Sequence, residues 1–216
     1  AARLAHGRAL ALLGQHVGLG AIMAMGRQER QRFNLSAADL FEEGEITLNE
    51  SRRLATDILR DPSATAIHSA TLAELYYCCA SANTRSEPPL LPQFEGGDYR
   101  GPQRRIELVG ALTHKSIALS LSAIETLREA GAGQRSECQA VMKDVGKVLA
   151  FRARLPPAIM RPDDEEQSRR WLKQALDLSK RLKGRNHPGT KNVERLLGDD
   201  SEAGSESDAE AGGGGE

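Results

Sequence analysis

The chain has 216 residues, of which 39% are hydrophobic but only 4% aromatic, and its formal net charge is −1 at pH 7. Ala and Leu dominate the apolar set, which favours helices and excludes the aromatic, β-branched composition of a sandwich or barrel. Residues 198–216 carry seven acids and no Lys or Arg, so the rest of the chain is mildly basic. Without a clustered basic face, this excess predicts no nucleic-acid partner.

The cysteines indicate a reducing compartment, because there are three, Cys78, Cys79 and Cys138, and two are adjacent. An odd, adjacent set does not suit a secreted disulfide framework, so we expect a cytoplasmic protein. No apolar run reaches the roughly 18 residues of a membrane span. The first acid is Glu29, and a basic, acid-poor start is also typical of an organelle transit peptide, so organelle targeting stays open.

The N-terminal half predicts three helices. A degenerate first helix carries Leu10 and ends at Gly14. Ser36 is a plausible helix cap, but Thr47 and Glu50 form a capping box, which is the better one, so a further helix is expected to begin at Thr47. Its buried face should hold Ile58 and Leu59, and Pro62 should end it. The next helix is expected over residues 63–83.

A loop is predicted over residues 84–104, since four prolines and three glycines lie between Ser86 and Gln103. A helix should follow over residues 104–131, with Leu121 among its buried positions and Gly131 as its C-cap. Another begins after a Ser136 cap. The last long helix covers residues 165–184, with acids at its start and Lys or Arg at its end, as the helix dipole favours.

The last helix pair resembles tetratricopeptide repeats, whose helices cross at small residues. Its first helix has Met142, Val145, Gly146 and Leu149, and its second has Ser168, Leu172, Ala175 and Leu176. Gly184, His187, Pro188 and Thr190 are similar to the inter-repeat turn of kinesin-light-chain-type repeats. An earlier pair matches less fully, through Leu72, Ala73, Tyr76, Ser116, Ala123 and Ile124.

This resemblance implies an all-α, tetratricopeptide-like α-solenoid of about three imperfect helix pairs in residues 1–197. Residues 198–216 should form a disordered acidic tail, because they hold no apolar residue larger than Ala. The C-terminal helical domain of SET/MYND lysine methyltransferases also resembles these repeats. A helical accessory domain of a larger enzyme is therefore the alternative interpretation.

No catalytic, cofactor or metal site can be assembled from the sequence. The five histidines form no HExxH motif, the adjacent cysteines lack CxxC spacing, and there is no phosphate-binding GxxxxGK loop. His187 is interpreted as a turn residue. We therefore expect a non-catalytic scaffold or adaptor that binds a protein or peptide.

The expected binding surface lies on the first helix of the last pair. Lys143 and Lys147 stand one turn apart and could hold an acidic peptide, with Tyr76, Tyr77 and Leu149 as apolar anchors. The family's Lys/Asn carboxylate clamp is incomplete here, and a solvated basic stripe is the alternative. In the tail, Ser205 and Ser207 precede acids at the spacing that acidophilic kinases prefer, so both are expected phosphorylation sites.

Overall fold

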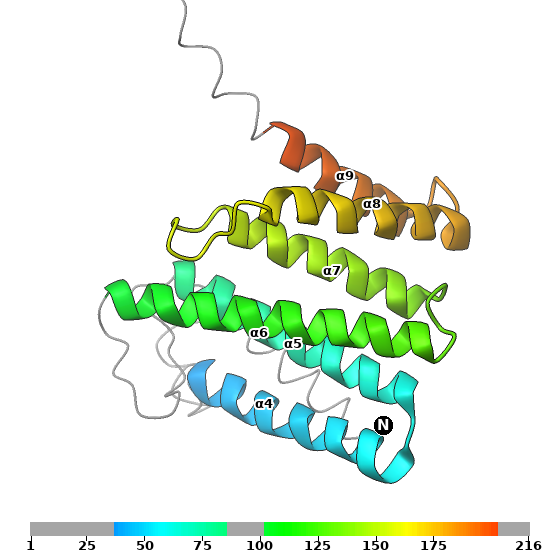
Figure 1. Cartoon of the computed structure of the whole chain (residues 1–216), viewed down its shortest axis with the longest axis horizontal. Coiled ribbons are helices and arrows are strands. Elements are labelled where there is room, and N and C mark those ends of the chain that lie inside the picture. Colours follow the sequence, from blue (N-terminus) through cyan, green and yellow to red (C-terminus); the bar gives the residue numbers. More distant parts are fainter. Residues whose placement is uncertain (1–36, 86–101, 203–216) are drawn as a thin grey trace, which may run out of the picture.

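The computed structural model describes residues 37–85 and 102–202, and every regular element in these ranges is helical. The elements are α4 (Ala37–Arg53), the π-helical turn η2 (Leu54–Leu59), α5 (Pro62–Arg85), α6 (Pro102–Glu129), α7 (Ser136–Ala153), α8 (Asp164–Lys183) and α9 (Pro188–Glu202). Figure 1 shows the helices stacked in chain order with alternating direction. The all-α prediction is confirmed for the described residues.

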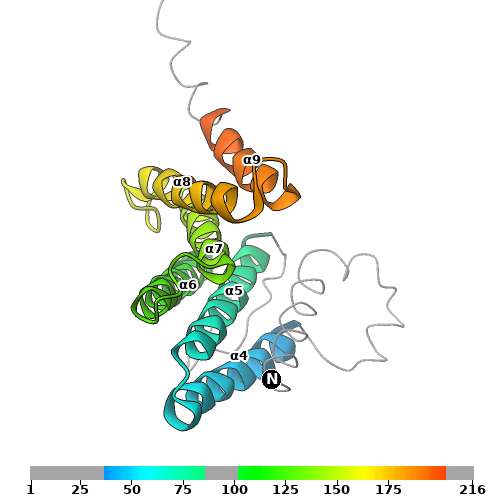
Figure 2. The same ribbon diagram turned by 90° about the vertical axis from the view of Figure 1, so that its right-hand side faces the viewer.

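Neighbouring helices in the chain are also neighbours in space. The most extensive contacts are α5 with α6 and α7 with α8, so these helices form two hairpins. Smaller contacts join α4 to α5, α6 to α7 and α8 to α9, and α5 and α9 each also touch α7. Figure 2 shows the resulting zigzag from one helix to the next. Among the described helices, none is long and apolar enough to cross a membrane.

The buried side chains form two clusters. The first joins α4, α5 and the start of α6, and its members are Phe41, Leu48, Leu72, Leu75, Tyr76, Cys78, Cys79, Ala80, Leu108, Val109 and Leu112. The second joins the end of α6 to α7, α8 and α9, and it includes Ile117, Ile124, Leu127, Cys138, Val141, Met142, Val145, Leu149, Leu172 and Val193. Helices α5 and α6 contribute to both, so the clusters follow each other along the stack.

The helix expected to begin at Thr47 is longer than predicted, because α4 is already helical at Ala37. Phe41, Leu48 and Ala55 are buried at seven-residue steps, so one packed stripe continues on both sides of Thr47 and outweighs the capping preference of this residue. Thr47 is therefore an interior residue of α4. The local capping signal was outweighed by packing against α5.

The segment ends before Pro62, as expected, but the prediction that Ile58 and Leu59 are buried was wrong. Ile58 and Leu59 are 70% and 69% exposed, because they lie in the π-helical turn, whose wider winding departs from the 3.6-residue spacing. Arg60 then ends it in the left-handed region at φ 49°. Asp61 caps the next helix through Oδ1, which accepts hydrogen bonds from two backbone amides. Pro62 is thus the first residue of α5.

Other boundaries differ in smaller ways. Arg135, not Ser136, is the N-cap of α7, and the Ser136 hydroxyl contacts Glu137 instead. Leu121 is 40% exposed, because the buried face of α6 passes through Ser116 and Ser120 instead. Helices α5 and α6 extend into the predicted loop, of which residues 86–101 lie outside the described part. Helix α9 continues through Glu202, past the expected start of the tail at 198.

Candidate functional site

The expected peptide-binding residues lie where α7 faces α5. Lys147 Nζ lies 5.6 Å from the ring centroid of Tyr77 on α5, within cation–π range. The edge of that ring meets Phe151 of α7, with centroids 5.5 Å apart and planes at 86°. Tyr77 and Phe151 are half-buried, so each offers an apolar surface beside a cation. Phe151 was not among the expected anchors, although it is one turn beyond Lys147.

Lys143 and Lys147 share one counter-ion. Asp144 Oδ1 lies 3.5 Å from Lys143 Nζ and 3.6 Å from Lys147 Nζ. The three side chains are 26–36% exposed, so they remain accessible to a ligand. One carboxylate cannot neutralise two ammonium groups, and this triad therefore carries one net positive charge. This triad therefore attracts an acidic ligand less strongly than two unpaired lysines would.

Two of the expected anchors are not accessible. Leu149 is 1% exposed and belongs to the core between α7 and α8, so its interpretation as a groove anchor is wrong. Tyr76 is 6% exposed, and its hydroxyl donates to a Glu45 carboxylate oxygen, which ties α5 to α4. Burial, with the nearby Glu45 charge, raises the pKa of Tyr76. Tyr76 therefore joins the first hairpin to α4.

Cys78 lies near the triad, but its buried thiol is poorly suited to act as a nucleophile. Burial raises the pKa of its thiol to about 12; the Glu74 charge adds to this effect and the Lys147 charge opposes it. The thiolate, which is the reactive form, is therefore scarce at neutral pH. No cluster of His, Cys, Asp and Glu in the described ranges could hold a metal ion.

Gly146 positions the triad by letting α7 approach α8 closely. A Cβ atom at Gly146 would lie 2.6 Å from Leu172 Cγ and 2.8 Å from its Cδ2. The Ser168 hydroxyl of α8 donates to the Gly146 carbonyl oxygen at 2.9 Å. The small residue expected at this crossing is confirmed as a site of close packing.

The same contact occurs in the first hairpin. The Ser116 hydroxyl of α6 donates to the Ala73 carbonyl oxygen of α5 at 2.7 Å, and this bond is also buried. In the match between the two helix pairs of this sequence, Ala73 corresponds to Gly146 and Ser116 corresponds to Ser168. Each of the two hairpins thus has one buried hydroxyl–carbonyl hydrogen bond between its two helices, at the positions that were matched in the sequence.

The turn between α8 and α9 gives each motif residue a role. Gly184 has φ 85° and its amide donates to Lys180 O, which ends α8. His187 Nδ1 accepts the Gly189 amide at 3.0 Å, and Pro188 is the first residue of α9. Thr190 is fully buried, and its hydroxyl donates to Gly184 O at 2.9 Å. The prediction of His187 as a turn residue is confirmed.

A buried ion pair joins α7 to the start of α8, and the sequence analysis missed it. Arg152 Nε and Nη2 donate to the two carboxylate oxygens of Asp164 at 2.9 and 2.5 Å. The side chains are 7% and 1% exposed. The Arg161 amide also donates to Asp164 at 2.8 Å, which fixes the connection between the helices. The acid run at the start of α8 was its only signal in the sequence.

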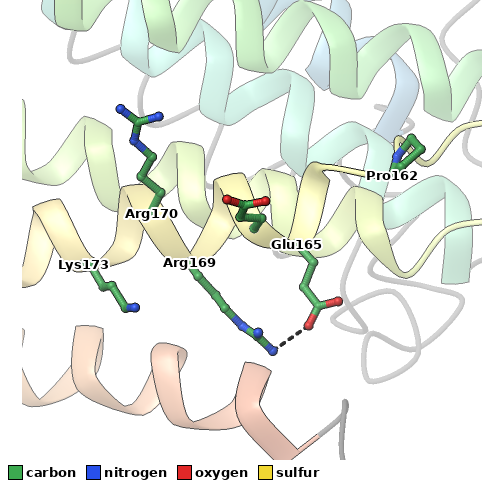
Figure 3. Close-up of a pocket in the computed structure, with 6 residues that line it drawn as sticks. Pro162, Glu165, Arg169, Arg170 and Lys173 are labelled. Carbon is green, nitrogen blue, oxygen red and sulfur yellow. Dashed lines mark hydrogen bonds and ion pairs between the residues drawn. The ribbon is translucent and has the colours of Figure 1, made fainter. Parts of the chain in front are cut away.

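A second surface feature is a shallow groove of about 580 Å³ on α8, lined by Pro162, Glu165, Glu166, Arg169, Arg170 and Lys173. In Figure 3, Arg169 and Lys173 point toward α9, whereas Arg170 points the other way. Arg169 Nη2 pairs with Glu165 Oε1 at 2.6 Å. The sequence analysis assigned no role to these cations.

Comparison with protein-family models, curated proteins and solved structures found no match for this chain. The fold and the sites above therefore rest on the geometry of this chain alone. The expected phosphorylation sites, Ser205 and Ser207, lie outside the described residues.

Proposed function

We propose that this chain is a non-catalytic protein-interaction scaffold built from stacked, tetratricopeptide-like helix pairs. The observation that carries the proposal is the pair of buried bonds from Ser116 to Ala73 and from Ser168 to Gly146. An equivalent bond in successive hairpins is what a repeated structural unit produces, because each unit solves the same packing problem. Stacked units of this kind form extended surfaces suited to binding other proteins.

Helix α9 supports a third, partial unit. Gly198 follows Gly146 by 52 residues, the same interval that separates Ser116 from Ser168. At this interval, the buried Val141 and Cys138 of α7 correspond to the buried Val193 and Thr190 of α9. Helix α9 would then be the first helix of a third pair. The interval is longer than the roughly 34 residues of a standard tetratricopeptide repeat, so we propose likeness in packing and not in period.

The binding surface that we propose is the side of the stack formed by the first helices α5, α7 and α9. On α7 it presents the triad Lys143–Asp144–Lys147 beside Tyr77 and Phe151. At the 52-residue interval, Arg195 of α9 corresponds to Lys143, which extends the basic line to the next first helix. A surface with cations next to half-buried aromatic rings suits an acidic peptide that carries an apolar side chain. The buried free thiols favour a cytoplasmic location.

The experiment compares two charge-reversal variants of the whole chain. Lys143→Glu/Lys147→Glu changes the proposed surface, and Arg181→Glu/Arg185→Glu makes the same charge change at the exposed end of α8 and in the turn that follows it. Proteins captured from a cell lysate are quantified by mass spectrometry at low and high salt. We expect wild type and the turn variant to capture the same salt-sensitive partners.

The surface variant should lose these partners. Two exposed ion pairs contribute about 1–2 kcal/mol together, so their affinity should fall by roughly a factor of 5–30. Equal recovery by all three proteins would mean that the triad is only a solvated face. Equal loss in both variants would assign the effect to net charge and not to this surface.

A further inference from the structure

We propose that His187 is a pH-sensitive cap, whose protonation weakens the docking of α9 on α8. His187 immediately precedes Pro188, the first residue of α9, in the turn that joins these two helices (Figure 1). Its Nδ1 atom accepts a hydrogen bond from the Gly189 amide at 3.0 Å, as an N-cap side chain does. The device acts on the fold itself, so it does not depend on the partner proposed above.

Only the neutral imidazole can form this cap. A ring nitrogen that accepts a hydrogen bond carries a lone pair, whereas a protonated imidazole has N–H groups on both nitrogens. Protonation of His187 therefore removes the acceptor of the Gly189 amide. The imidazolium would also stand at the positive, N-terminal end of the α9 dipole, where a cation is unfavourable. Both effects weaken the start of α9 as the pH falls.

A fixed cation beside the cap acts in the same direction. Lys183 Nζ and His187 Nδ1 lie 3.8 and 3.1 Å from the point where a Cβ atom of Gly189 would be. The Lys183 ammonium donates to Gln139 Oε1 of α7 at 3.0 Å, which holds it near the turn. A second positive charge on His187 would therefore be repelled by Lys183.

The other charged groups near the turn do not supply a counter-ion. They are Arg185 in the turn, Lys180 on α8, Lys191 and Glu194 on α9, and Arg135 and Glu137 at the start of α7. Glu194 pairs with Lys180 at 3.1 Å, and Glu137 accepts a hydrogen bond from the Ser136 hydroxyl. His187 has no ion pair with a carboxylate in the described ranges. Nothing there compensates an imidazolium at the cap.

The contacts that dock α9 follow the cap directly. Thr190 and Val193 are both 0% exposed. The Thr190 hydroxyl donates to Gly184 O and accepts from the Ser179 hydroxyl, both at 2.9 Å. Helix α9 has 15 residues, two of them glycines, so it is marginal as an isolated helix. Loss of its first turn therefore removes the buried contacts that hold it on α8.

The sign of the pH dependence follows from the protonation state. Histidine changes charge between about pH 5 and pH 8, and the cap needs the neutral form. The contribution of the cap to α9 docking is therefore present above this range and is lost as the pH falls through it. Since α9 carries Arg195 at the end of the proposed binding surface, partner binding would weaken in the same range; this consequence rests on the proposed function.

The test is hydrogen–deuterium exchange of the whole chain at about pH 7.5 and about pH 5.5, without any partner. Mass spectrometry gives protection factors, which remove the intrinsic pH dependence of exchange. We expect the amides of α9 from Thr190 onward to lose protection roughly fivefold at the lower pH, the scale of one helix cap. His187→Asn should keep its protection at both pH values, because an amide oxygen caps without titrating. His187→Ala should show the lower protection at both.

Three results would overturn the proposal. Equal losses at low pH in wild type and His187→Asn would place the pH sensitivity elsewhere. Wild-type protection of α9 in His187→Ala at about pH 7.5 would show that the cap does not support docking. A loss that spreads over α5 would assign the effect to the buried His68 and to global unfolding. His114→Gln changes an exposed histidine on α6 and should behave as wild type. Circular dichroism confirms that each variant is folded.

Discussion

Gly146 and Gly198 both lie within helices, but Gly146 is closely packed and Gly198 is surrounded by open space. A Cβ atom at Gly146 would meet the buried Leu172 side chain at 2.6 Å and the Ser168 carbonyl oxygen at 3.3 Å. At Gly198 it would meet nothing within 4 Å. Glycine at 146 is required by the close crossing of α7 and α8, whereas glycine at 198 only weakens α9 through its conformational entropy.

This contrast gives a prediction of opposite sign for one substitution. Gly146→Ala should destabilise the protein by about 1–3 kcal/mol, because α8 must move away from the added methyl group. Gly198→Ala should stabilise it by up to ~1 kcal/mol, because alanine has the higher helix propensity. Urea denaturation monitored by circular dichroism measures both. If Gly146→Ala leaves the midpoint unchanged, the crossing is not as close as the structure describes.

Between elements, the buried pair Arg152–Asp164 holds the connection from α7 to α8. The carboxylate accepts two hydrogen bonds from the guanidinium and one from the Arg161 amide, so its bonding capacity is well used. Burying two charges costs desolvation energy that their attraction only partly offsets. The pair therefore contributes mainly by fixing where α8 begins.

We predict that breaking this pair is worse than removing it. Asp164→Asn should cost about 3–5 kcal/mol, because it leaves the Arg152 charge buried without a counter-ion. Arg152→Met/Asp164→Leu should recover much of that loss. Thermal denaturation of each variant measures the effect, and Glu165→Gln is the control, since its exposed pair with Arg169 contributes under ~1 kcal/mol. A shift for Asp164→Asn no larger than that of the control would contradict the assignment.

At the scale of the whole molecule, each hairpin packs mainly on its neighbours in the chain, and the core consists of two successive clusters. The three thiols are distributed between them. Cys78 and Cys79 lie in the first cluster, and Cys138 lies in the second. Labelling of these thiols can therefore show whether the two clusters unfold together.

We predict that none of the three thiols reacts readily with iodoacetamide at pH 8 in the folded protein. Burial raises the pKa of Cys78 and of Cys79 to about 12, and it also raises that of Cys138. For Cys78 and Cys79 the folded-state pKa lies above the ordinary value of 9, so the contribution of these two thiols to stability is present below pH 9 and is lost as the pH rises toward 12. Mass spectrometry of labelling in increasing urea gives the order of exposure.

Because contacts in the stack are mostly between neighbouring helices, we expect the two clusters to unfold at different urea concentrations. Cys138 and the Cys78–Cys79 pair should then be labelled in separate steps. A single step for all three thiols, with the circular dichroism transition at the same midpoint, would show that the two hairpins form one cooperative unit.

Several features depend only on short-range patterns and could be predicted from the amino-acid sequence. The helical class follows from composition and 3.6-residue periodicity. The close crossing at Gly146 and the turn from Gly184 to Thr190 were implied by the resemblance to tetratricopeptide repeats, and small-residue packing and capping chemistry give the physical reason for both. These signals act within a few residues, so they are readable without knowing what the helix packs against. The same locality explains why Gly131, at φ 70°, was recognised as the residue that ends α6.

The tertiary structure alone decided which patterns prevail and which side chains meet. Because α4 packs against α5, it is helical on both sides of Thr47. Core packing buries Leu149, so a ligand cannot reach it. The cation–π contact of Lys147 with Tyr77 and the pairing of Arg152 with Asp164 join different helices, and no local pattern specifies such partners. The physical reason is that a helix buries the face whose packing removes the most apolar surface from water. How much surface each face can bury depends on the neighbouring helices.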